Sequence, residues 1–327
     1  MGQSFYLETG SVDPAYNLAF EEFVLKNAPS GDWLILWQNA NAIIVGRNQN
    51  ALEEINRLFV DAHNIKVIRR NTGGGTVYHD MGNLNYSFIT DDDGSSAARF
   101  TEPVVKALQG LGLDAESSGR NDILVSGKKV SGTAQHRIGS RILHHGTLLF
   151  DSNPDMIAGS LNPDPTKFTS KSVKSVRSRV GNIRSFLPRD MSISEFWNYL
   201  KTTLADAIVP VSLSPDELEQ VDALKKEKYD TWQWNFGSSP KFDSQIRQRF
   251  DGGLLQIHLT VRHGVIDGLV IYGDFLSLTP LDPLLDALKG CPYQQDAIES
   301  AIKDIDLASC LGAITREELV RCILNQL

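Results

Sequence analysis

Residues 69–83 read RRNTGGGTVYHDMGN, and this stretch decides more about the fold than any other. Residues 73–75 are three consecutive glycines, which leave backbone N–H groups uncovered and permit positive φ angles. Such a loop can form a concave nest for an anion. Arg69 and Arg70 precede it, and their fork-shaped donors suit phosphate or carboxylate. The stretch predicts an anion-binding loop, although on its own it also fits a glycine-rich hairpin with two surface arginines.

The loop does not match the common nucleotide-binding motifs. A P-loop needs a lysine at a fixed spacing after its glycines, and none stands there. The dinucleotide fingerprint GxGxxG fails because Tyr78 occupies the position of the third glycine. The chain also has no HExxH and no GxSxG motif. These absences exclude the usual sequence signatures of P-loop enzymes, dinucleotide enzymes, zinc proteases and serine hydrolases.

Regular structure is expected on both sides of the loop. Short apolar runs predict buried strands at residues 33–37, 42–45, 67–68, 86–89 and 148–150. Capping residues, in two cases followed by glutamate three positions later, predict helices that begin near Asp13, Thr101, Ser192 and Ser214.

A second informative stretch, GRNDILVSGKKVSGTA, spans residues 119–134. Residues 123–130 predict a β-hairpin with a tight turn at its centre. Asp122 is a candidate Mg²⁺ ligand, because Mg²⁺ binds one or two carboxylates together with phosphate oxygens. Lys129 lies across the hairpin, which can bring the two side chains to one site. From these residues alone, a solvated turn at Lys129 and a strand-end cap at Asp122 are also open.

A pair of histidines and a run of basic residues are two further candidate functional features. His144 and His145 directly precede the strand predicted at residues 148–150, and two adjacent histidines point to opposite faces of a strand, so they cannot easily chelate one metal. We expect one histidine to line a site and the other to lie at the surface. Five basic residues lie between Lys167 and Arg179 with no acid among them. This run fits either a solvated stripe or a mobile loop that covers a polyanionic ligand or meets an acidic partner.

The pattern changes in the last third of the chain. Residues 255–272 alternate apolar and polar positions on both sides of a turn, which predicts a hairpin with one face toward solvent. After Pro283 the apolar spacing is helical. We predict a domain boundary near residue 245. It divides the chain into a large domain, residues 1–245, and a small C-terminal domain, residues 246–327.

Composition limits the class of protein. The chain has 327 residues, 41% hydrophobic and 22% charged, which is ordinary for a globular protein with a real core. A net charge of −8 makes a long nucleic acid an improbable partner. No apolar run reaches the ~20 residues of a membrane helix, and no secretory signal is evident. The three cysteines, Cys291, Cys310 and Cys322, show no CxxC spacing, so a reducing, cytoplasmic setting is expected.

Five blocks of the sequence together resemble one family, the lipoate–protein ligases. Residues 70–83 are similar to that family's RR-x-(S/T)-GGG-x-V-(F/Y)-HD-x-GN signature. The other four blocks follow in the expected order: KVSGTA at 129–134, HGTLL at 145–149, SVRSRV at 175–180 and WQWNFG at 232–237. A single block of this kind is weak, but five in order are specific.

The resemblance implies an α+β fold: a mixed β-sheet flanked by helices, like class II synthetases and biotin ligases, with a small C-terminal α+β accessory domain. It implies a ligase domain that binds lipoate and ATP in residues 1–245, with Mg²⁺ held by Asp122. By residue matching, ATP or the adenylate would contact Arg70, Gly75, Thr76, Val77, Tyr78 and Lys129. Lipoate would contact Gly74, Asn83, Lys129 and His145, and Lys129 would be catalytic.

The implied reaction joins lipoate to AMP with release of pyrophosphate and then transfers the lipoyl group to a lysine of an acceptor. Acceptors in such a family are lipoyl-domain proteins: the E2 subunits of 2-oxoacid dehydrogenases and the glycine-cleavage H protein. A cysteine-dependent octanoyltransferase on this fold is disfavoured, since residues 1–290 contain no cysteine. A biotin ligase is also disfavoured, since the GRGRxGR-type loop of that family is missing from this sequence. A cysteine-independent lipoyl or octanoyl transferase and a non-catalytic lipoyl-adenylate-binding protein stay as alternatives.

Overall fold

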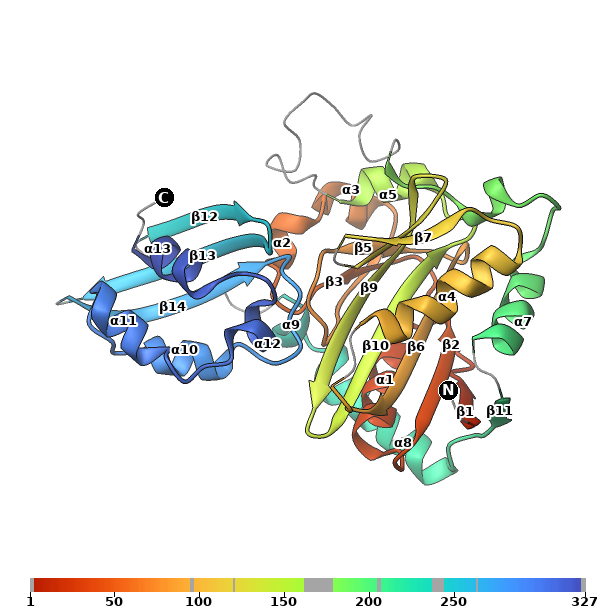
Figure 1. The fold of residues 1–327 in the computed structure, drawn as a ribbon, viewed down its shortest axis with the longest axis horizontal. Coiled ribbons are helices and arrows are strands. Elements are labelled where there is room, and N and C mark those ends of the chain that lie inside the picture. Colours follow the sequence, from red (N-terminus) through yellow and green to blue (C-terminus); the bar gives the residue numbers. More distant parts are fainter. Residues whose placement is uncertain are drawn as a thin grey trace.

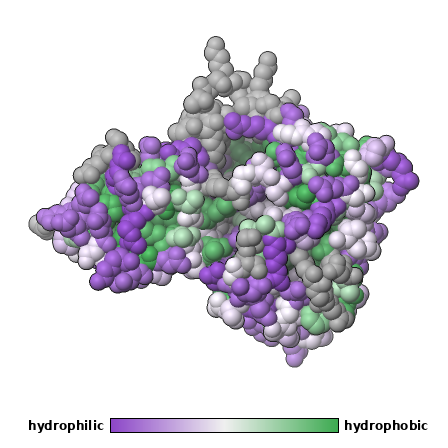
Figure 2. Space-filling view, viewed as in Figure 1, coloured by the Kyte–Doolittle hydropathy of each residue, from purple (hydrophilic) through white to green (hydrophobic). Residues whose placement is uncertain are grey.

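The computed structural model describes residues 3–94, 97–119, 121–161, 179–204, 207–236, 244–262 and 264–324. A large N-terminal part and a smaller C-terminal part lie side by side (Figure 1). The space-filling view shows hydrophilic residues over much of both parts, with hydrophobic patches on the C-terminal part and near the junction (Figure 2). Within the described ranges, no helix is long and apolar enough to cross a bilayer.

The large part is organised around an eight-stranded mixed sheet with the order β11-β1-β2-β6-β10-β9-β8-β7. Its strands are β1 (Gln3–Glu8), β2 (Asp32–Trp37), β6 (Asn83–Asp91), β7 (Ala115–Ser118), β8 (Asp122–Val125), β9 (Lys128–Ile138), β10 (Arg141–Leu149) and β11 (Ala207–Pro210). Strand β1 runs parallel to β2 and β11, and the other neighbours are antiparallel. Long antiparallel ladders through β6, β10 and β9 give one side of the site a rigid base.

A second, three-stranded sheet carries the triglycine stretch. Its order is β4-β3-β5, with β3 at Ala42–Val45, β4 at Lys66–Arg69 and β5 at Val77–His79. Strand β3 is parallel to β4 and antiparallel to β5. The chain from β4 to β5 must therefore cross the end of β3, and residues 70–76 make that crossing. The triglycine stretch is therefore a loop beside the C-terminal end of β3, the central strand of the small sheet.

Helices cover both faces of the large sheet: α4 (Ala98–Gly110), α7 (Ile193–Thr203) and the 3₁₀ helix η2 (Ile183–Phe186) on one face, and α1 (Pro14–Asn27), α8 (Pro215–Leu224) and the π-helix η3 (Lys225–Tyr229) on the other. Helices α2 (Ala51–Glu54), α3 (Arg57–Ala62) and α5 (Pro154–Ser160) pack against the small sheet, and α9 (Trp232–Asn235) contacts its strand β4. Strand β2 contributes side chains to two hydrophobic cores, because successive side chains of a strand point to opposite faces of the sheet. Leu34 and Leu36 join the core under α4 and α7, whereas Trp33 and Ile35 join the core under α1 and α8.

The C-terminal part has its own antiparallel sheet and its own core. Strands β12 (Ser244–Phe250), β13 (Gly253–Arg262) and β14 (Val265–Gly273) pack against α10 (Asp282–Leu288), α11 (Gln295–Ala301), α12 (Leu307–Leu311) and α13 (Arg316–Ile323). The hairpin expected within residues 255–272 and the helices expected after Pro283 are both present. The domain boundary at residue 245 stays a prediction. Below, the C-terminal part is called the accessory domain.

Most of the expected elements form, with one difference. The helices at Asp13, Ser192 and Ser214 have the predicted caps, and both capping boxes are present. The helix expected at Thr101 begins three residues earlier, at Ala98, because Phe100 is buried in the core one turn before Val104. The strands at 33–37 and 42–45 are close in sequence but belong to different sheets. In both cases tertiary packing outweighs the local signal.

Candidate active site

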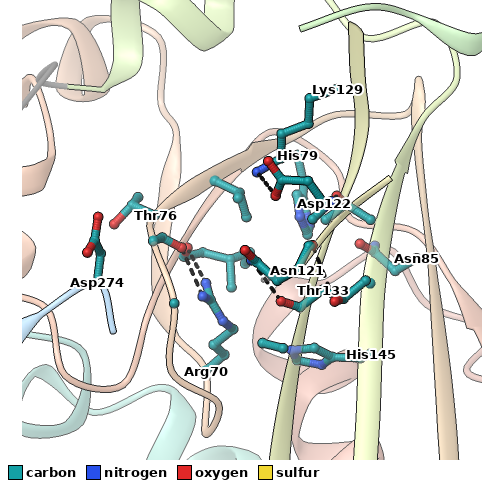
Figure 3. A pocket seen from close by; sticks show the side chains of 18 of the residues that line it. Arg70, Thr76, His79, Asn85, Asn121, Asp122, Lys129, Thr133, His145 and Asp274 are labelled. Carbon is teal, nitrogen blue, oxygen red and sulfur yellow. Dashed lines mark hydrogen bonds and ion pairs between the residues drawn. The ribbon is translucent and has the colours of Figure 1, made fainter. Parts of the chain in front are cut away.

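A pocket of about 690 Å³ lies where the triglycine loop, the β8–β9 hairpin, strand β10 and the accessory domain meet (Figure 3). Part of its wall is apolar: Leu18, Trp37 and Ile44 are shared with the core under α1. The rest of the wall is polar, with Arg70, Thr76, Asp122, Lys129 and Asp274 among its side chains. The pocket therefore suits a ligand with an apolar chain and a charged group.

The three glycines of the triglycine loop have different surroundings. A Cβ on Gly73 would lie 2.6 Å from the backbone nitrogen of Ser277, so the accessory domain packs against this position. Gly74 has φ +86°, which L-residues with side chains rarely adopt. A Cβ on Gly75 would meet nothing within 4 Å, and Gly75 lines the pocket. Gly75 thus leaves room for close approach of a ligand to the backbone.

Arg70 shapes the loop from behind. Its Nη2 donates to the carbonyls of Gly73 and Gly75 at 2.6 and 2.8 Å, and its Nη1 donates to the carbonyl of Ile44 at 3.1 Å. Burial lowers the pKa of the Arg70 guanidinium to about 10, which still leaves it charged near neutrality. By drawing two carbonyls toward itself, Arg70 fixes the curvature of the loop and adds positive charge beneath it.

A chain of buried hydrogen bonds links Arg70 to helix α1. The Arg70 Nε donates to the Thr72 hydroxyl at 2.8 Å, and that hydroxyl lies 2.8 Å from His145 Nε2. On the other side of the ring, His145 Nδ1 lies 2.9 Å from a carboxylate oxygen of Glu21. With the proton on Nδ1, His145 donates to Glu21 and accepts at Nε2 from the Thr72 hydroxyl, which in turn accepts from Arg70. The chain holds His145 and Thr72 in fixed orientations at the base of the pocket.

The β8–β9 hairpin brings Asp122 and Lys129 together, with the Lys129 Nζ 2.7 Å from Asp122 Oδ1. The turn uses Ser126 and Gly127 at positive φ. The register shifts after Ile123, so that Asp122 pairs with Gly132 whereas Leu124 pairs with Lys129. This bulge turns Lys129 onto the face that carries Asp122 and Gly132, whereas a regular ladder would point it to the opposite face. All three residues line the pocket.

The pocket is electropositive although the chain is acidic. Its lining includes four cationic side chains and two carboxylates, namely Arg70, Lys129, Arg179 and Arg249 against Asp122 and Asp274. His79 also lines it, but burial lowers the pKa of that imidazole to about 3, so it is neutral near pH 7. In a protein with a net charge of −8, this local excess of cations fits a polyanionic ligand.

The structure brings together most of the candidate residues from the sequence. Those that line the pocket are Arg70, Gly74, Gly75, Thr76, Val77, Asp122, Lys129 and His145. Tyr78 and Asn83 are not among the lining residues. Side chains alternate along β5, so the Tyr78 side chain points away from the pocket. It packs in the core of the small sheet, and its hydroxyl donates to the side chain of Asn41. Asn83 is buried at the start of β6 and donates to Asn85, which lines the pocket in its stead.

The expectation for the paired histidines is half right. His145 lines the pocket, but His144 is not at the surface: it is fully buried and stacks against Phe100 at 5.0 Å between ring centroids. Both faces of the large sheet are covered by helices, so neither face of β10 is exposed. The basic run from Lys167 lies outside the described residues except for Arg179, which lines the pocket.

Sequence reasoning missed several lining residues. Trp37, Asn121 and Thr133 stand beside predicted features and could have been found from their neighbours in the sequence. Arg249 and Asp274 come from the accessory domain and carry no local signal. Their position depends on how the two domains pack, which no motif records.

The fold and the pocket define a two-domain α+β protein with an electropositive ligand site between a glycine loop and a hairpin lysine. Residues 13–205 match the lipoyl protein ligase A/B catalytic domain, and residues 239–323 match the bacterial lipoate protein ligase C-terminus. The chain therefore belongs to the lipoate–protein ligase family, and it is an enzyme of that family. The family, fold class and ligase function predicted from the five blocks are confirmed.

Individual relatives agree over nearly the whole length. Lipoate–protein ligase 1 of Staphylococcus aureus is 44% identical over 323 residues, covering 97% of this chain and 98% of its own. Lipoate–protein ligase LplJ of Bacillus subtilis is 41% identical over 320 residues, covering 95% and 97%.

Solved structures of the same kind are also similar. The crystal structure of P. falciparum LipL1 with lipoate has a TM-score of 0.76 at 26% identity, covering 98% of this chain and 99% of that one. A bi-partite ligase and its E2 lipoyl domain from Thermoplasma acidophilum gives 0.65 at 30% identity, covering 74% and 99%. Lipoate–protein ligase A bound with ATP gives 0.63 at 29% identity, covering 72% and 98%.

Proposed function

We propose that this ligase activates lipoate with ATP in the pocket described above and then transfers the lipoyl group to a lysine of an acceptor protein. The observation that carries the proposal is that Lys129 and the triglycine loop share one electropositive pocket with an apolar wall. Relatives of similar fold have been solved with lipoate and with ATP. One pocket that accepts both ligands is what a reaction between them requires.

The two ends of the pocket suit the two ends of lipoyl-AMP. Trp37, Ile44 and Leu18 offer an apolar surface for the hydrocarbon chain and dithiolane ring of lipoate. The backbone of Gly75 and Thr76 offers N–H groups for the α-phosphate and ribose side of the nucleotide. In this orientation the acyl–phosphate junction lies beside Lys129, so the reacting atoms meet where the cation is available.

In the first half-reaction, a carboxylate oxygen of lipoate bonds to the α-phosphorus and the bond to the β-phosphate breaks. The electron pair leaves with pyrophosphate, and negative charge builds on the oxygens around the α-phosphorus. Lys129 can contact both the carboxylate oxygen and an α-phosphate oxygen, because an ammonium is a compact charge with three donors. Its ion pair with Asp122 holds the ammonium at the pocket until the ligand competes for it.

In the second half-reaction, the amine of the acceptor lysine attacks the acyl carbon of the mixed anhydride. An amide forms, the acyl–phosphate bond breaks, AMP leaves with the electron pair, and the amine loses a proton to water. Lys129 stabilises the carbonyl oxygen as it gains charge and then the phosphate of the departing AMP. The same side chain thereby serves both steps without moving between sites.

Mg²⁺ fits this pocket as an ion that arrives with the phosphates. Asp122 is 33% exposed at its side chain and borders the pocket, so its carboxylate can bind an ion. In the described part of the chain, no group of three or more His, Cys, Asp or Glu side chains forms a metal cage. One carboxylate plus phosphate oxygens is a usual Mg²⁺ environment. The bound ion would neutralise phosphate charge, while Asp122 positions it.

The proposed acceptors are lipoyl-domain proteins, that is, E2 subunits and the glycine-cleavage H protein. The Thermoplasma relative was solved in a study of a ligase and its E2 lipoyl domain, which favours this class of partner. Transfer through an enzyme thiol is disfavoured. Cys291, Cys310 and Cys322 are all buried in the accessory domain, and burial raises the pKa of the Cys310 thiol to about 11. A cytoplasmic setting accords with these unpaired thiols.

The test uses the full chain with ATP, Mg²⁺, lipoate and a purified lipoyl domain, read by the mass shift of the lipoyl domain. We expect a mass gain of one lipoyl group that requires ATP. Lipoate-dependent exchange of labelled pyrophosphate into ATP measures the first half-reaction separately. A mass gain without ATP from a preformed thioester donor would favour a cysteine-independent transferase. Binding of lipoyl-AMP with neither exchange nor mass gain would favour a non-catalytic binding protein.

A further inference from the structure

Two charged residues of the accessory domain form part of the pocket wall. Arg249 lies near the end of β12 and Asp274 directly follows β14, and both line the same pocket as Lys129. In Figure 3, Asp274 lies close to Thr76 on the side of the pocket opposite the hairpin. The accessory domain therefore supplies charge to a site whose other charged residues belong to the large domain.

Asp274 holds Arg249 in place. One oxygen of its carboxylate accepts the backbone N–H of Leu254 at 2.6 Å, and the other lies 3.2 Å from Arg249 Nη2. The Asp274 side chain is 7% exposed, whereas that of Arg249 is 26% exposed. A buried carboxylate with one oxygen bonded to the backbone is a rigid support. The guanidinium that it orients keeps part of its surface open at the pocket.

The segment after Asp274 is attached directly to the triglycine loop. The Gly74 N–H donates to the carbonyl of Phe275 at 3.0 Å, and the Asn48 side chain donates to the Ser277 hydroxyl at 2.9 Å. The backbone N–H of Gly273 donates to the carbonyl of Asn48 at 2.6 Å. These bonds on both sides of Asp274 fix its distance from the loop. Arg249, carried by Asp274, is fixed relative to the loop as well.

Phosphate chemistry gives such a cation a specific use. In the proposed reaction Lys129 serves the α-phosphate, while the leaving pyrophosphate carries most of the negative charge of ATP. Arg70 uses donors on the carbonyls of Ile44, Gly73 and Gly75, so much of its hydrogen-bonding capacity belongs to the loop. Arg249, a second guanidinium at the accessory-domain side of the pocket, has the fork geometry that binds two phosphate oxygens at once.

We infer that Arg249 binds the β- and γ-phosphates of ATP and stabilises the departing pyrophosphate, with Asp274 as its positioning residue. This rests on the proposed function and assigns the accessory domain a chemical part in the first half-reaction. When the bond from the α-phosphorus to the β-phosphate breaks, the electron pair passes to pyrophosphate next to Arg249. The second half-reaction contains no pyrophosphate. Arg249 is therefore required for adenylation and dispensable for transfer.

The experiment compares full-length Arg249→Met with the wild-type enzyme in two assays. The first is lipoate-dependent exchange of labelled pyrophosphate into ATP. The second is transfer from synthetic lipoyl-AMP to a lipoyl domain, without ATP. We expect Arg249→Met to lower exchange by about 10²-fold, in the range found when one charge-stabilising donor is lost. Transfer is expected to stay within about twofold. The KM for pyrophosphate rises, because the variant lacks the group that holds it.

Three further variants separate this role from a structural one. Arg247→Met removes another arginine of β12 that does not line the pocket, and it is expected to leave both assays unchanged. Arg249→Lys keeps the charge and is expected to restore part of the exchange rate. Asp274→Asn keeps the shape and is expected to raise the KM for pyrophosphate less than Arg249→Met does.

The outcomes are distinguishable. An equal loss in both assays, or no loss in either, for a variant with a normal melting temperature overturns the role of Arg249 alone. If the wild-type enzyme shows neither exchange nor transfer, the proposed function fails and this inference fails with it. A selective loss of exchange with intact transfer supports the inference.

Discussion

The triglycine loop and the β8–β9 hairpin form opposite walls of one pocket but are built in different ways. Within the loop, Arg70 and Thr72 are buried and hydrogen-bonded to backbone and to His145. On the hairpin, the side chains of Lys129 and Asp122 are 37% and 33% exposed and meet each other across the strands. The loop is held in one conformation before a ligand binds, whereas the Lys129 ammonium on the hairpin can exchange its contact with Asp122 for one with a ligand. In this pocket the binding loop is held rigidly by buried hydrogen bonds, whereas the lysine proposed for the chemistry is partly exposed.

The largest expected effect lies on the hairpin. Lys129→Ala removes the cation from the acyl–phosphate junction, so overall lipoylation should fall by about 10²–10³-fold or more. The melting temperature should change little, since the side chain is partly exposed and its ion pair with Asp122 contributes little to stability. Lipoylation measured by mass shift and unfolding measured by calorimetry together test this separation. Full turnover in the variant would remove Lys129 from its role.

The next effect separates two glycines of the loop. Gly73→Ala puts a Cβ 2.6 Å from Ser277 N and 2.8 Å from the Phe275 carbonyl, so backbone must move; overpacking of this kind costs ~1–3 kcal/mol. Gly75→Ala meets nothing within 4 Å and should leave the free energy of unfolding within ~0.5 kcal/mol of wild type. Because Gly75 lines the pocket, Gly75→Ala should instead weaken ATP binding. Denaturant unfolding and ATP titration distinguish the two.

An equal loss in the free energy of unfolding for the two glycine variants would contradict close packing of the accessory domain against Gly73. The same result would show that the loop has a single conformational requirement rather than three different ones.

A smaller effect tests the hydrogen-bond chain beneath the loop. Thr72→Val keeps the shape of the side chain but leaves Arg70 Nε and His145 Nε2 without the hydroxyl between them, which costs ~1–3 kcal/mol. Thr72→Ser keeps the hydroxyl and serves as the matched control. We expect a lower melting temperature and a higher KM for ATP in the valine variant alone. Equal behaviour of both variants would mean that the chain does not hold the loop.

The last expected effect is a pH dependence of stability that arises from a buried histidine at the pocket. Burial lowers the pKa of His79 from 6.5 to about 3, so between these values the unfolded chain binds a proton that the folded chain does not. Stability is therefore full above about pH 6.5 and falls as the pH drops through this window, by up to ~1.4 kcal/mol per pH unit for one such proton.

His79→Gln should flatten part of this decline, because glutamine can still accept the hydrogen bond from Asn39 and does not titrate. Melting temperatures of both proteins from pH 7 to pH 4.5 provide the measurement. His136 and His144, with pKa values lowered to about 4 and about 3, should maintain the rest of the slope. Identical slopes for wild type and His79→Gln would contradict the proposed cause.

Much of the architecture could be predicted because its signals are local. The hairpin after Asp122 and the capping boxes at Ser192 and Ser214 formed where the pattern indicated. The strand predicted at residues 148–150 is the last part of a longer strand, β10, that begins at Arg141. Helix α4 began early because burial of Phe100 outweighs a local start signal at Thr101. The roles assigned to individual site residues stay predictions until the variants are measured.

The family, the glycine-rich loop and the hairpin that carries Asp122 and Lys129 could be read from local sequence, because each depends on residues close together in the chain. Only the tertiary structure decided that a bulge turns Lys129 toward the loop and that Gly73 serves to admit the accessory domain. Only the packing of the two domains brought Arg249 into the pocket. Register and domain packing depend on contacts between segments far apart in sequence, and no single stretch of residues contains that information.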